Sequence, residues 1–261
     1  MQKKDNALVS VIVNCHNGEQ YLEECIKSVI NQSYENWELI FWDNCSSDNS
    51  KLVLEKFSDK RIKYFRSNKF LNLYNARNLA IEKSKGEYIG FLDTDDFWEK
   101  DKIDIQVKFF NKHKDYEIVF SNYYLIKEKQ KVRTIKHKLI LPSGKITQNL
   151  LNFYSIGILT TLVRRNIFKR YKFNKDYNII GDFDLFITLS QKFKIGSIQE
   201  PLATYRMHSS NYSSQNLETH IKELKSWINI NDQRLRQKGY NVNQQKFFLL
   251  KLKIKSFFNI K

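Results

Sequence analysis

The sequence lacks the features that would place it in several broad classes of protein. It has no apolar run long enough to span a bilayer, and no apolar block with a cleavage site opens it. Its three cysteines, Cys15, Cys25 and Cys45, are odd in number and lack the spacing of metal ligands, which disfavours a disulfide framework or a zinc site. We therefore expect a cytoplasmic protein, either soluble or peripheral on the inner face of a membrane.

A glycine-rich phosphate loop is also missing. The chain has eight glycines and two prolines. The segment that follows the first apolar run, residues 14–18, matches neither the GxGxxG fingerprint nor the Walker pattern. A dinucleotide-binding enzyme or a P-loop enzyme is therefore disfavoured.

Positive charge is in large excess, with a formal net charge of +16. Such a charge favours polyanionic partners, namely nucleic acid, an anionic membrane face or phosphorylated substrates. The excess is scattered as lysine among asparagine and isoleucine rather than gathered in an arginine-rich groove, so it also fits a simple compositional bias. We therefore expect no nucleic-acid partner.

Apolar runs alternate with helical patterns in the first part of the chain. The predicted strands lie at residues 8–14, 37–42, 61–65 and 87–92, and the predicted helices between them at 19–32, 46–57 and 74–83. This alternation predicts right-handed βαβ units. The predicted fold class is therefore α/β, with a mostly parallel, Rossmann-like central sheet flanked by helices.

The rest of the chain is predicted to be more varied. After a helix that follows Asp101, we expect a strand at 118–126, a basic hairpin or loop at 127–145, a helix near 148–154, a strand near 158–164, a helix ending at 193 and an extended segment at 195–205. A helix is predicted at 217–236. The tail, 246–261, mixes lysines with apolar residues, and its residues 250–255 alternate like a strand.

The change of composition near residue 214 suggests a domain boundary. We expect a domain at residues 1–214 and a basic, helical C-terminal extension at residues 215–261. A basic amphipathic tail suits an anionic membrane surface. A helix packed on the domain, or in the interface of a homo-oligomer, is the alternative.

Residues 91–98, FLDTDDFW, bring three carboxylates to the end of a predicted strand. Asn14 ends one predicted strand and Asp43 follows another, and ligands of parallel sheets gather beyond these carboxyl ends. Asp93 and Asp95 can share a face because alternate residues of an extended segment do. Clustered carboxylates persist most easily around a divalent cation or a cationic ligand. An acidic turn that caps the next helix is the alternative.

Four segments together resemble the motifs of a family 2 glycosyltransferase of the GT-A fold, over roughly residues 8 to 212. They are VSVIVNCHNGEQYLEECIKSVINQSYENWELIFWDNCSSDNS, similar to the nucleotide-binding opening, NARNLAIEKSKGEYIGFLDTDD, similar to the segment with the DxD motif, GDFDLF, similar to the base-bearing motif, and YRMHSSNYS, similar to the closing motif. Their order and spacing agree with the family's.

The resemblance implies an inverting transfer of a hexosyl or N-acetylhexosaminyl group from a nucleotide donor, usually a UDP-sugar, with Mn²⁺ or Mg²⁺. The acceptor would be a hydroxyl of a glycan or of a lipid-linked sugar in the biosynthesis of a surface polysaccharide, such as lipopolysaccharide or capsule. A nucleotide-sugar-binding scaffold protein without turnover is the alternative.

The resemblance also implies roles for residues that would contact the donor. Asp43 would accept a hydrogen bond from the nucleotide base, and the alternative is an ordinary helix cap. Asn14 and His16 would line the base and ribose. Glu19 would meet the ribose, or else favour the start of a helix. Arg77 would offset the charge of the diphosphate, or else lie on a solvated helix face.

Further implied roles concern the metal and the acceptor. Asp95 and His208 would bind the metal ion, with Asp93 contacting ribose or metal-bound water and Asp96 supporting the geometry. His208 could instead be structural, and Arg206 could assist electrostatically. Asp182 would be the catalytic base that takes the proton of the acceptor hydroxyl.

The sequence departs from the family's pattern at several positions. The opening loop commonly carries Pro-x-Tyr-Asn, whereas residues 14–17 are NCHN, and Ala80 stands where a glycine is common. Many members have Glu-Asp where this chain has Gly181 and Asp182. Because the base is kept, we expect an active enzyme whose contacts with the donor differ from those of other members. The missing acid leaves the local contacts to the acceptor open.

Overall fold

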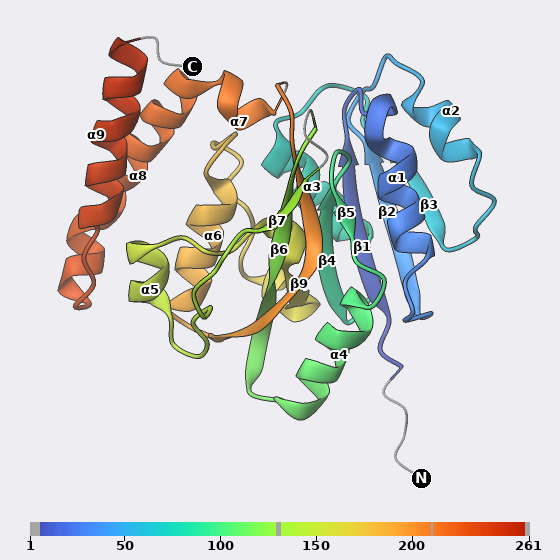
Figure 1. The fold of residues 1–261 in the computed structure, drawn as a ribbon, viewed down its shortest axis with the longest axis horizontal. Helices are drawn as coiled ribbons and strands as arrows, with labels where there is room; N and C mark the ends of the chain where they lie inside the picture. The colour runs from blue at the N-terminus through green and yellow to red at the C-terminus, as the bar shows by residue number, and fades with distance from the viewer. Residues whose placement is uncertain (1–5, 129–131, 210, 259–261) are drawn as a thin grey trace.

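The computed structural model describes residues 6–128, 132–209 and 211–258. Its first part is a parallel sheet with helical crossovers (Figure 1), in the order β3-β2-β1-β4. The elements are β1 (Val9–Cys15), α1 (Glu19–Ile30), β2 (Trp37–Asp43), α2 (Ser50–Glu55), β3 (Ile62–Arg66), α3 (Leu73–Lys83) and β4 (Tyr88–Asp93). The predicted βαβ units are confirmed.

The second part extends the same sheet in mixed orientation. Its elements are β5 (Phe97–Trp98), α4 (Lys102–Lys112), β6 (Tyr116–Lys127), β7 (Arg133–Ile135), α5 (Thr147–Asn152), the 3₁₀ turn η1 (Ile158–Thr160), β8 (Leu162–Arg164), the 3₁₀ turn η2 (Arg165–Lys169), α6 (Gly181–Ser190), β9 (Lys194–Met207), α7 (Tyr212–Gln215), α8 (Leu217–Gln237) and α9 (Asn243–Phe257). The order continues β4-β8-β6-β9-β5, with β7 on β6. Among the described residues of this part, only β6 and β9 pair in parallel.

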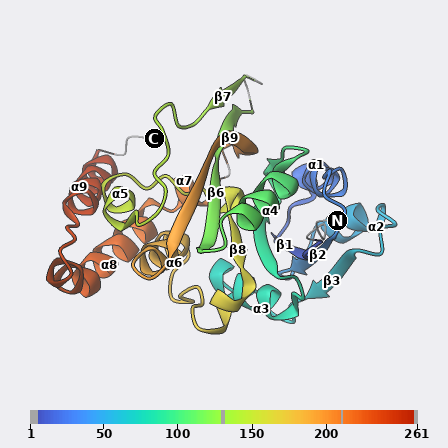
Figure 2. The same ribbon diagram turned by 90° about the horizontal axis from the view of Figure 1, so that it is seen from below.

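Apolar side chains fill both faces of the sheet. β1 and β2 are buried along their whole length, as expected for strands covered on both sides. One core lies under α1, α2 and α4, and the other lies under α3, α5, α6 and α8. α8 and α9 lie side by side at one end of the molecule, opposite α1 and α2 (Figures 1 and 2).

The C-terminal residues form two helices that belong to the second core. α8 contributes Leu224, Trp227 and Ile228 to the apolar cluster that also contains Leu185 and Phe186 of α6. The tail is helical up to Phe257, so the alternation at 250–255 does not form a strand. Residues 259–261 of the predicted tail lie outside the described residues. The division at residue 214 stays a prediction, since the helices beyond it pack on the same core.

Several elements differ from their predicted bounds by a few residues, and two of them are changed by polar side chains that bond to nearby backbone. The helix expected at 46–57 is reduced to α2, since Asp43 accepts the backbone N–H of Ser46 in the preceding loop and Asp48 accepts that of Ser50, where α2 begins. The strand expected near 158–164 begins as the turn η1, where the hydroxyls of Thr160 and Thr161 donate to carbonyls three residues earlier. Such local bonds compete with regular structure.

Lys102, in the first turn of α4, is a fully buried lysine. Its Nζ donates to Gln106 Oε1 at 2.6 Å and lies 4.0 Å from the ring centroid of Trp98. Burial lowers the pKa of Lys102 well below its usual value. The folded protein therefore releases a proton that the unfolded chain still binds in the alkaline range below the usual lysine pKa.

We predict that Lys102→Met flattens the pH dependence of stability. The folded-state pKa of Lys102 lies below its unfolded value, so the wild type gains stability as pH rises towards about 10.4, by up to about 1.4 kcal/mol per pH unit. Urea unfolding at several pH values between about 8 and 10 measures this slope. The control is Lys112→Met, at an exposed position of the same helix. Equal slopes in the two variants would contradict the prediction.

Candidate active site

The acidic turn, residues 93–96, is bonded to a neighbouring strand through its last carboxylate. Asp96, which follows β4, is 2 % exposed, and its Oδ1 accepts the backbone N–H of Arg206 in β9 at 2.8 Å. Burial, with the nearby charges of Asp95 and Asp93, raises the pKa of Asp96 well above its usual value. Asp96 therefore has the supporting position expected from the sequence.

The two residues predicted to bind metal lie in contact. His208, just beyond β9, has its Nε2 2.9 Å from Oδ2 of Asp95. The side chain of Arg206 holds the same turn, with Nε donating to the Asp95 carbonyl at 3.0 Å. Burial and the charge of Asp93 raise the pKa of Asp95, while His208 opposes the rise. Residues 113 positions apart in sequence thus form one polar pair.

The pair fits a cation that shares its ligands with a substrate. In the part of the chain that the structure describes, no group of three or more His, Cys, Asp or Glu side chains is arranged to hold a metal ion. Asp95 and His208 would supply two ligands, and phosphate oxygens and water the others. Mg²⁺ commonly keeps several waters and binds through few protein ligands together with substrate phosphates.

Arg77 joins the acidic turn to the predicted base. It lies on α3, is 2 % exposed, and donates from Nη2 to Asp93 Oδ1 at 2.5 Å. Burial alone would lower the pKa of Arg77, but the negative charges of Asp93 and Asp182 outweigh burial and raise it. Arg77 is therefore not on a solvated helix face, which excludes that alternative.

Asp182, in the first turn of α6, is partly exposed and faces two tyrosines. The hydroxyl of Tyr74 lies 3.2 Å from its Oδ1, and that of Tyr154 lies 3.5 Å from its Oδ2. Burial raises the pKa of Asp182, and the charge of Arg77 limits the rise. Burial also raises the pKa of both tyrosines well above the usual value, so their hydroxyls stay protonated as donors. Each oxygen of the carboxylate thus faces the hydroxyl of one tyrosine.

Tyr74 also explains why glycine stands at position 181. A Cβ atom on Gly181 would lie 2.5 Å from the Tyr74 ring, closer than real Cβ atoms come to their neighbours. The Tyr74 hydroxyl lies 2.8 Å from the carbonyl of Ile179 as well, so the ring braces the loop before α6. The departure from the family's acid at this position is thus a packing requirement.

A carboxylate on α8 holds the loop that presents Asp182. Glu223 is 7 % exposed, and its two oxygens accept the backbone N–H groups of Asn178, Ile179 and Ile180 at 2.6, 3.0 and 3.2 Å. Four residues along the same helix, Trp227 donates from Nε1 to Asp184 Oδ1 at 2.9 Å. α8 therefore holds the loop and the first turn of α6 that carry the predicted base.

The residues predicted to contact the nucleotide lie at the carboxyl edge of the sheet. In register, Asn14 pairs with Asp93 and Cys15 with Asp43, so the three polar clusters meet as expected. Asn14 is 9 % exposed, and both polar atoms of its side chain lack a hydrogen-bond partner among the described residues. A buried amide without a partner is costly, which fits a position completed by a ligand.

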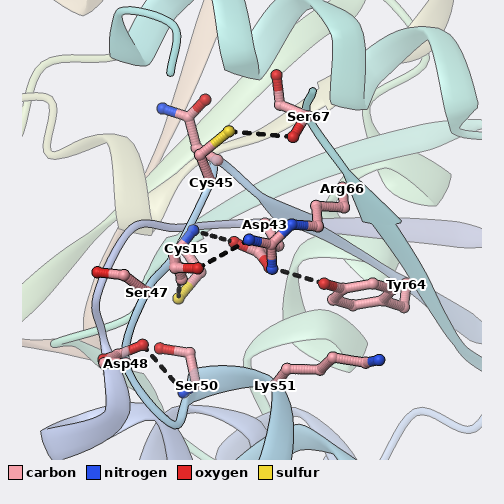
Figure 3. A network of polar contacts seen from close by, with 12 residues as sticks. Cys15, Asp43, Cys45, Ser47, Asp48, Ser50, Lys51, Tyr64, Arg66 and Ser67 are labelled. Atoms are coloured by element: carbon pink, nitrogen blue, oxygen red, sulfur yellow. Dashed lines mark hydrogen bonds and ion pairs between the residues drawn. The ribbon is translucent and has the colours of Figure 1, made fainter. Parts of the chain in front are cut away.

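Asp43 lies at the centre of a network of polar contacts (Figure 3). Its carboxylate accepts the backbone N–H of Ser46 at 2.7 Å, the hydroxyl of Tyr64 at 2.7 Å and Nη1 of Arg66 at 2.8 Å. The alternative, an ordinary helix cap, is wrong, because α2 begins at Ser50 with Asn49 as its N-cap, and Asp43 bonds to Ser46 in the loop before it. Its contact with a nucleotide base stays a prediction.

His16 and Glu19 flank the same loop. His16 is exposed, its Nδ1 lies 2.9 Å from the carbonyl of Asn44, and its ring centroid lies 4.6 Å from that of Phe70. The Glu19 carboxylate accepts the backbone N–H of Asn49 at 2.9 Å and so anchors the start of α2. Contacts of His16 and Glu19 with a nucleotide remain predictions.

Several residues at this site were missed by sequence reasoning. They are Tyr64, Arg66, Phe70, Tyr74, Tyr154, Glu223 and Trp227. One signal was available for Glu223, which interrupts the apolar face formed by Leu224, Trp227 and Ile228. An acid on a buried helix face needs partners.

Comparisons with known proteins agree on one family. The model of the family described as Glycosyl transferase family 2 matches residues 10–186. The chain is 33 % identical over 224 residues to the Escherichia coli UDP-Glc:alpha-D-GlcNAc-diphosphoundecaprenol beta-1,3-glucosyltransferase WfgD, covering 85 % of this chain and 84 % of that protein. It is 30 % identical over 210 residues to the putative teichuronic acid biosynthesis glycosyltransferase TuaG of Bacillus subtilis, covering 79 % and 82 %.

The solved structures show the same fold. Residues 1–349 of S. aureus TarS, in complex with UDP-GlcNAc, match with a TM-score of 0.67 at 17 % identity, covering 85 % of this chain and 66 % of that chain. The chain thus spans about two thirds of the TarS fragment. At this identity the likeness shows the fold, here the GT-A fold, and no more.

We predict that Glu223→Ala destabilises the fold by about 2 to 4 kcal/mol, because three backbone N–H groups lose their buried acceptor. Urea unfolding measures the loss. Glu218→Ala, at an exposed position of the same helix, is the control and should change stability by less than about 0.5 kcal/mol. Equal stability of the two variants would show that Glu223 does not hold the loop.

Proposed function

The chain belongs to glycosyl transferase family 2, and from this premise we propose that it is an inverting, metal-dependent glycosyltransferase. It moves a hexosyl or N-acetylhexosaminyl group from a UDP-sugar to a hydroxyl of a glycan or lipid-linked acceptor in surface polysaccharide biosynthesis. One observation carries the proposal. Arg77 contacts Asp93 of the acidic turn and lies 5.4 Å from the ring centroid of Tyr74, whose hydroxyl is 3.2 Å from Asp182 Oδ1, so a candidate base lies near a candidate metal and nucleotide site.

Asp182 is proposed to act as the base. It takes the proton of the acceptor hydroxyl while that oxygen forms a bond to the anomeric carbon. The bond from the anomeric carbon to the donor phosphate breaks, and the nucleoside diphosphate leaves with its electron pair. Tyr74 and Tyr154 orient the carboxylate. The charge of Arg77 limits the rise that burial causes in the pKa of Asp182.

The donor is proposed to lie along the carboxyl edge of the sheet. Asn14, His16, Glu19 and Asp43 would face its base and ribose, and Asp93 would contact ribose or water at the metal. The names of WfgD, which uses UDP-Glc, and of TarS, which was solved with UDP-GlcNAc, support a UDP-sugar. Asp95 and His208 would hold Mn²⁺ or Mg²⁺, which supplies positive charge to the departing diphosphate.

Association with an anionic membrane surface is part of the proposal. Among the described residues, no helix combines the length and apolarity needed to cross a bilayer. The exposed side of α9 carries apolar residues, namely Phe247, Phe248, Leu250, Ile254 and Phe257, together with several lysines. Such a surface suits the interface of an anionic membrane. A homo-oligomer interface is the alternative for this face.

We predict that Asp182→Asn lowers the rate of sugar transfer by about 10³-fold, since the acceptor loses its base. UDP release in the presence of acceptor measures the rate. The thermal stabilisation by UDP-sugar and Mn²⁺ should be kept, because donor binding does not need the base. Asp176→Asn, at an exposed position of the loop before α6, is the control. A scaffold protein would show no turnover even in the wild type, and unchanged turnover in Asp182→Asn would refute the assignment of the base.

Asp95 and His208, the proposed metal ligands, can be tested separately from the base. Asp95→Asn and His208→Ala should each weaken the apparent affinity for Mn²⁺ in the presence of UDP by at least about 10-fold, because a ligand is lost. The rise of the melting temperature with Mn²⁺ concentration reports this affinity. The control is His113→Ala, at the end of α4. Wild-type affinity in both site variants would place the metal elsewhere.

A further inference from the structure

A cavity of about 630 Å³ adjoins Asp182 on the side of the C-terminal helices. Its walls come from α5 and the residues that follow it, from the start of α6, and from α8 and α9. Asp182 is the only carboxylate among its described lining residues, and Lys251 of α9 is the only lysine. The residues proposed to bind the donor, such as Asn14, Asp43 and His208, do not line it.

The position of the cavity suits an acceptor. In an inverting displacement, the acceptor hydroxyl meets the anomeric carbon opposite the leaving nucleotide, and the base must reach that hydroxyl. The acceptor should therefore lie next to Asp182, in space that the residues proposed to bind the donor do not line. The cavity is space of this kind.

The walls of the cavity are largely aromatic and aliphatic. Tyr154 and Phe183, whose ring centroids are 5.2 Å apart, lie beside Asp182. Leu224 is buried, whereas Phe248 is 44 % exposed and therefore lies towards the mouth. Aromatic faces can pack against the C–H groups of a sugar ring, and the same surfaces accept an alkyl chain.

Positive charge and more apolar surface lie at the mouth. Lys251 is exposed and lies 4.4 Å from the ring centroid of Phe247. Beyond it, α9 continues with the exposed apolar residues Ile254 and Phe257 and with Lys255. The cavity thus joins the carboxylate of Asp182, an aromatic wall and the exposed Lys251, and α9 continues beyond it with more lysines and apolar residues.

We propose that this cavity is the binding site for an acceptor sugar carried on a lipid diphosphate. The sugar ring lies against Tyr154, Phe183 and Phe248, with its hydroxyl at Asp182. Lys251 pairs with the diphosphate, and the first part of the lipid chain follows the exposed side of α9. The order of these groups matches the order of sugar, diphosphate and chain in such an acceptor. The inference rests on the proposed function and gives it an acceptor class.

Direct binding tests the inference without any need for turnover. The probe is N-acetylglucosamine diphosphate bearing a farnesyl chain, titrated calorimetrically below its micelle concentration. Lys251→Glu should weaken binding by about 10-fold or more, because it replaces a charge-assisted contact by repulsion. Gln244→Trp places a large ring at an exposed lining position and should weaken binding by a similar factor.

Two surface variants serve as matched controls. Lys253→Glu makes the same charge change on α9 outside the cavity, and Gln233→Trp adds the same ring to an exposed position of α8. Both should bind the probe within about twofold of the wild type. Equal weakening by Lys251→Glu and Lys253→Glu, or unchanged binding in the two cavity variants, would overturn the inference. Binding of free N-acetylglucosamine as tight as that of the probe would also overturn it.

Slow hydrolysis of UDP-Glc and UDP-GlcNAc, measured without acceptor, separates the two proposals. If the wild type hydrolyses a UDP-sugar but the cavity variants bind the probe as tightly as the wild type does, the proposed function stands and this inference is wrong. Cavity-dependent probe binding by a protein that neither hydrolyses a UDP-sugar nor transfers to the probe would support the site and count against the enzyme.

Discussion

The buried guanidinium of Arg77 is the interaction on which the site depends. A cation 2 % exposed is tolerated only with anionic partners, and Arg77 has Asp93 in contact and the charge of Asp182 nearby. These carboxylates come from the end of β4 and from the first turn of α6, on different sides of the site. Arg77 thus connects the turn after β4 with the surroundings of Asp182, because it lies 5.4 Å from the ring centroid of Tyr74, whose hydroxyl faces that carboxylate. Its charge limits the rise that burial causes in the pKa of Asp182.

α8 likewise supplies a charged partner to buried polar groups of the site. Asp182 needs its loop fixed, and the loop's backbone N–H groups are satisfied by Glu223 rather than by regular secondary structure. Glu223 is held in turn because its neighbours Leu224 and Trp227 belong to the apolar core shared with α6. The helices that follow the sugar-transfer motifs therefore help to build the site, and they also wall the cavity beside it.

The sequence predicted the parts of the structure that depend on local pattern. β1, β2 and β4 are mainly apolar runs, so they were readily assigned, and Asp43, Asp93 and Asp182 could be placed because each stands in a motif. Tyr74 and Glu223 could not be placed in this way. Their contacts to Asp182 and to its loop span 108 and about 45 residues, and no periodicity encodes such a distance. The short α2 and the turn η1 were missed because side-chain bonds to nearby backbone override propensity.

The close fit of Gly181 against the Tyr74 ring also limits how the chain can change over time. An acid at position 181, as in many members of the family, requires a smaller side chain at position 74, and the smaller side chain would remove a hydroxyl that faces Asp182. Either substitution alone leaves a clash or a hole beside the base. The residues at positions 74 and 181 are therefore coupled by packing, and a change at one calls for a change at the other.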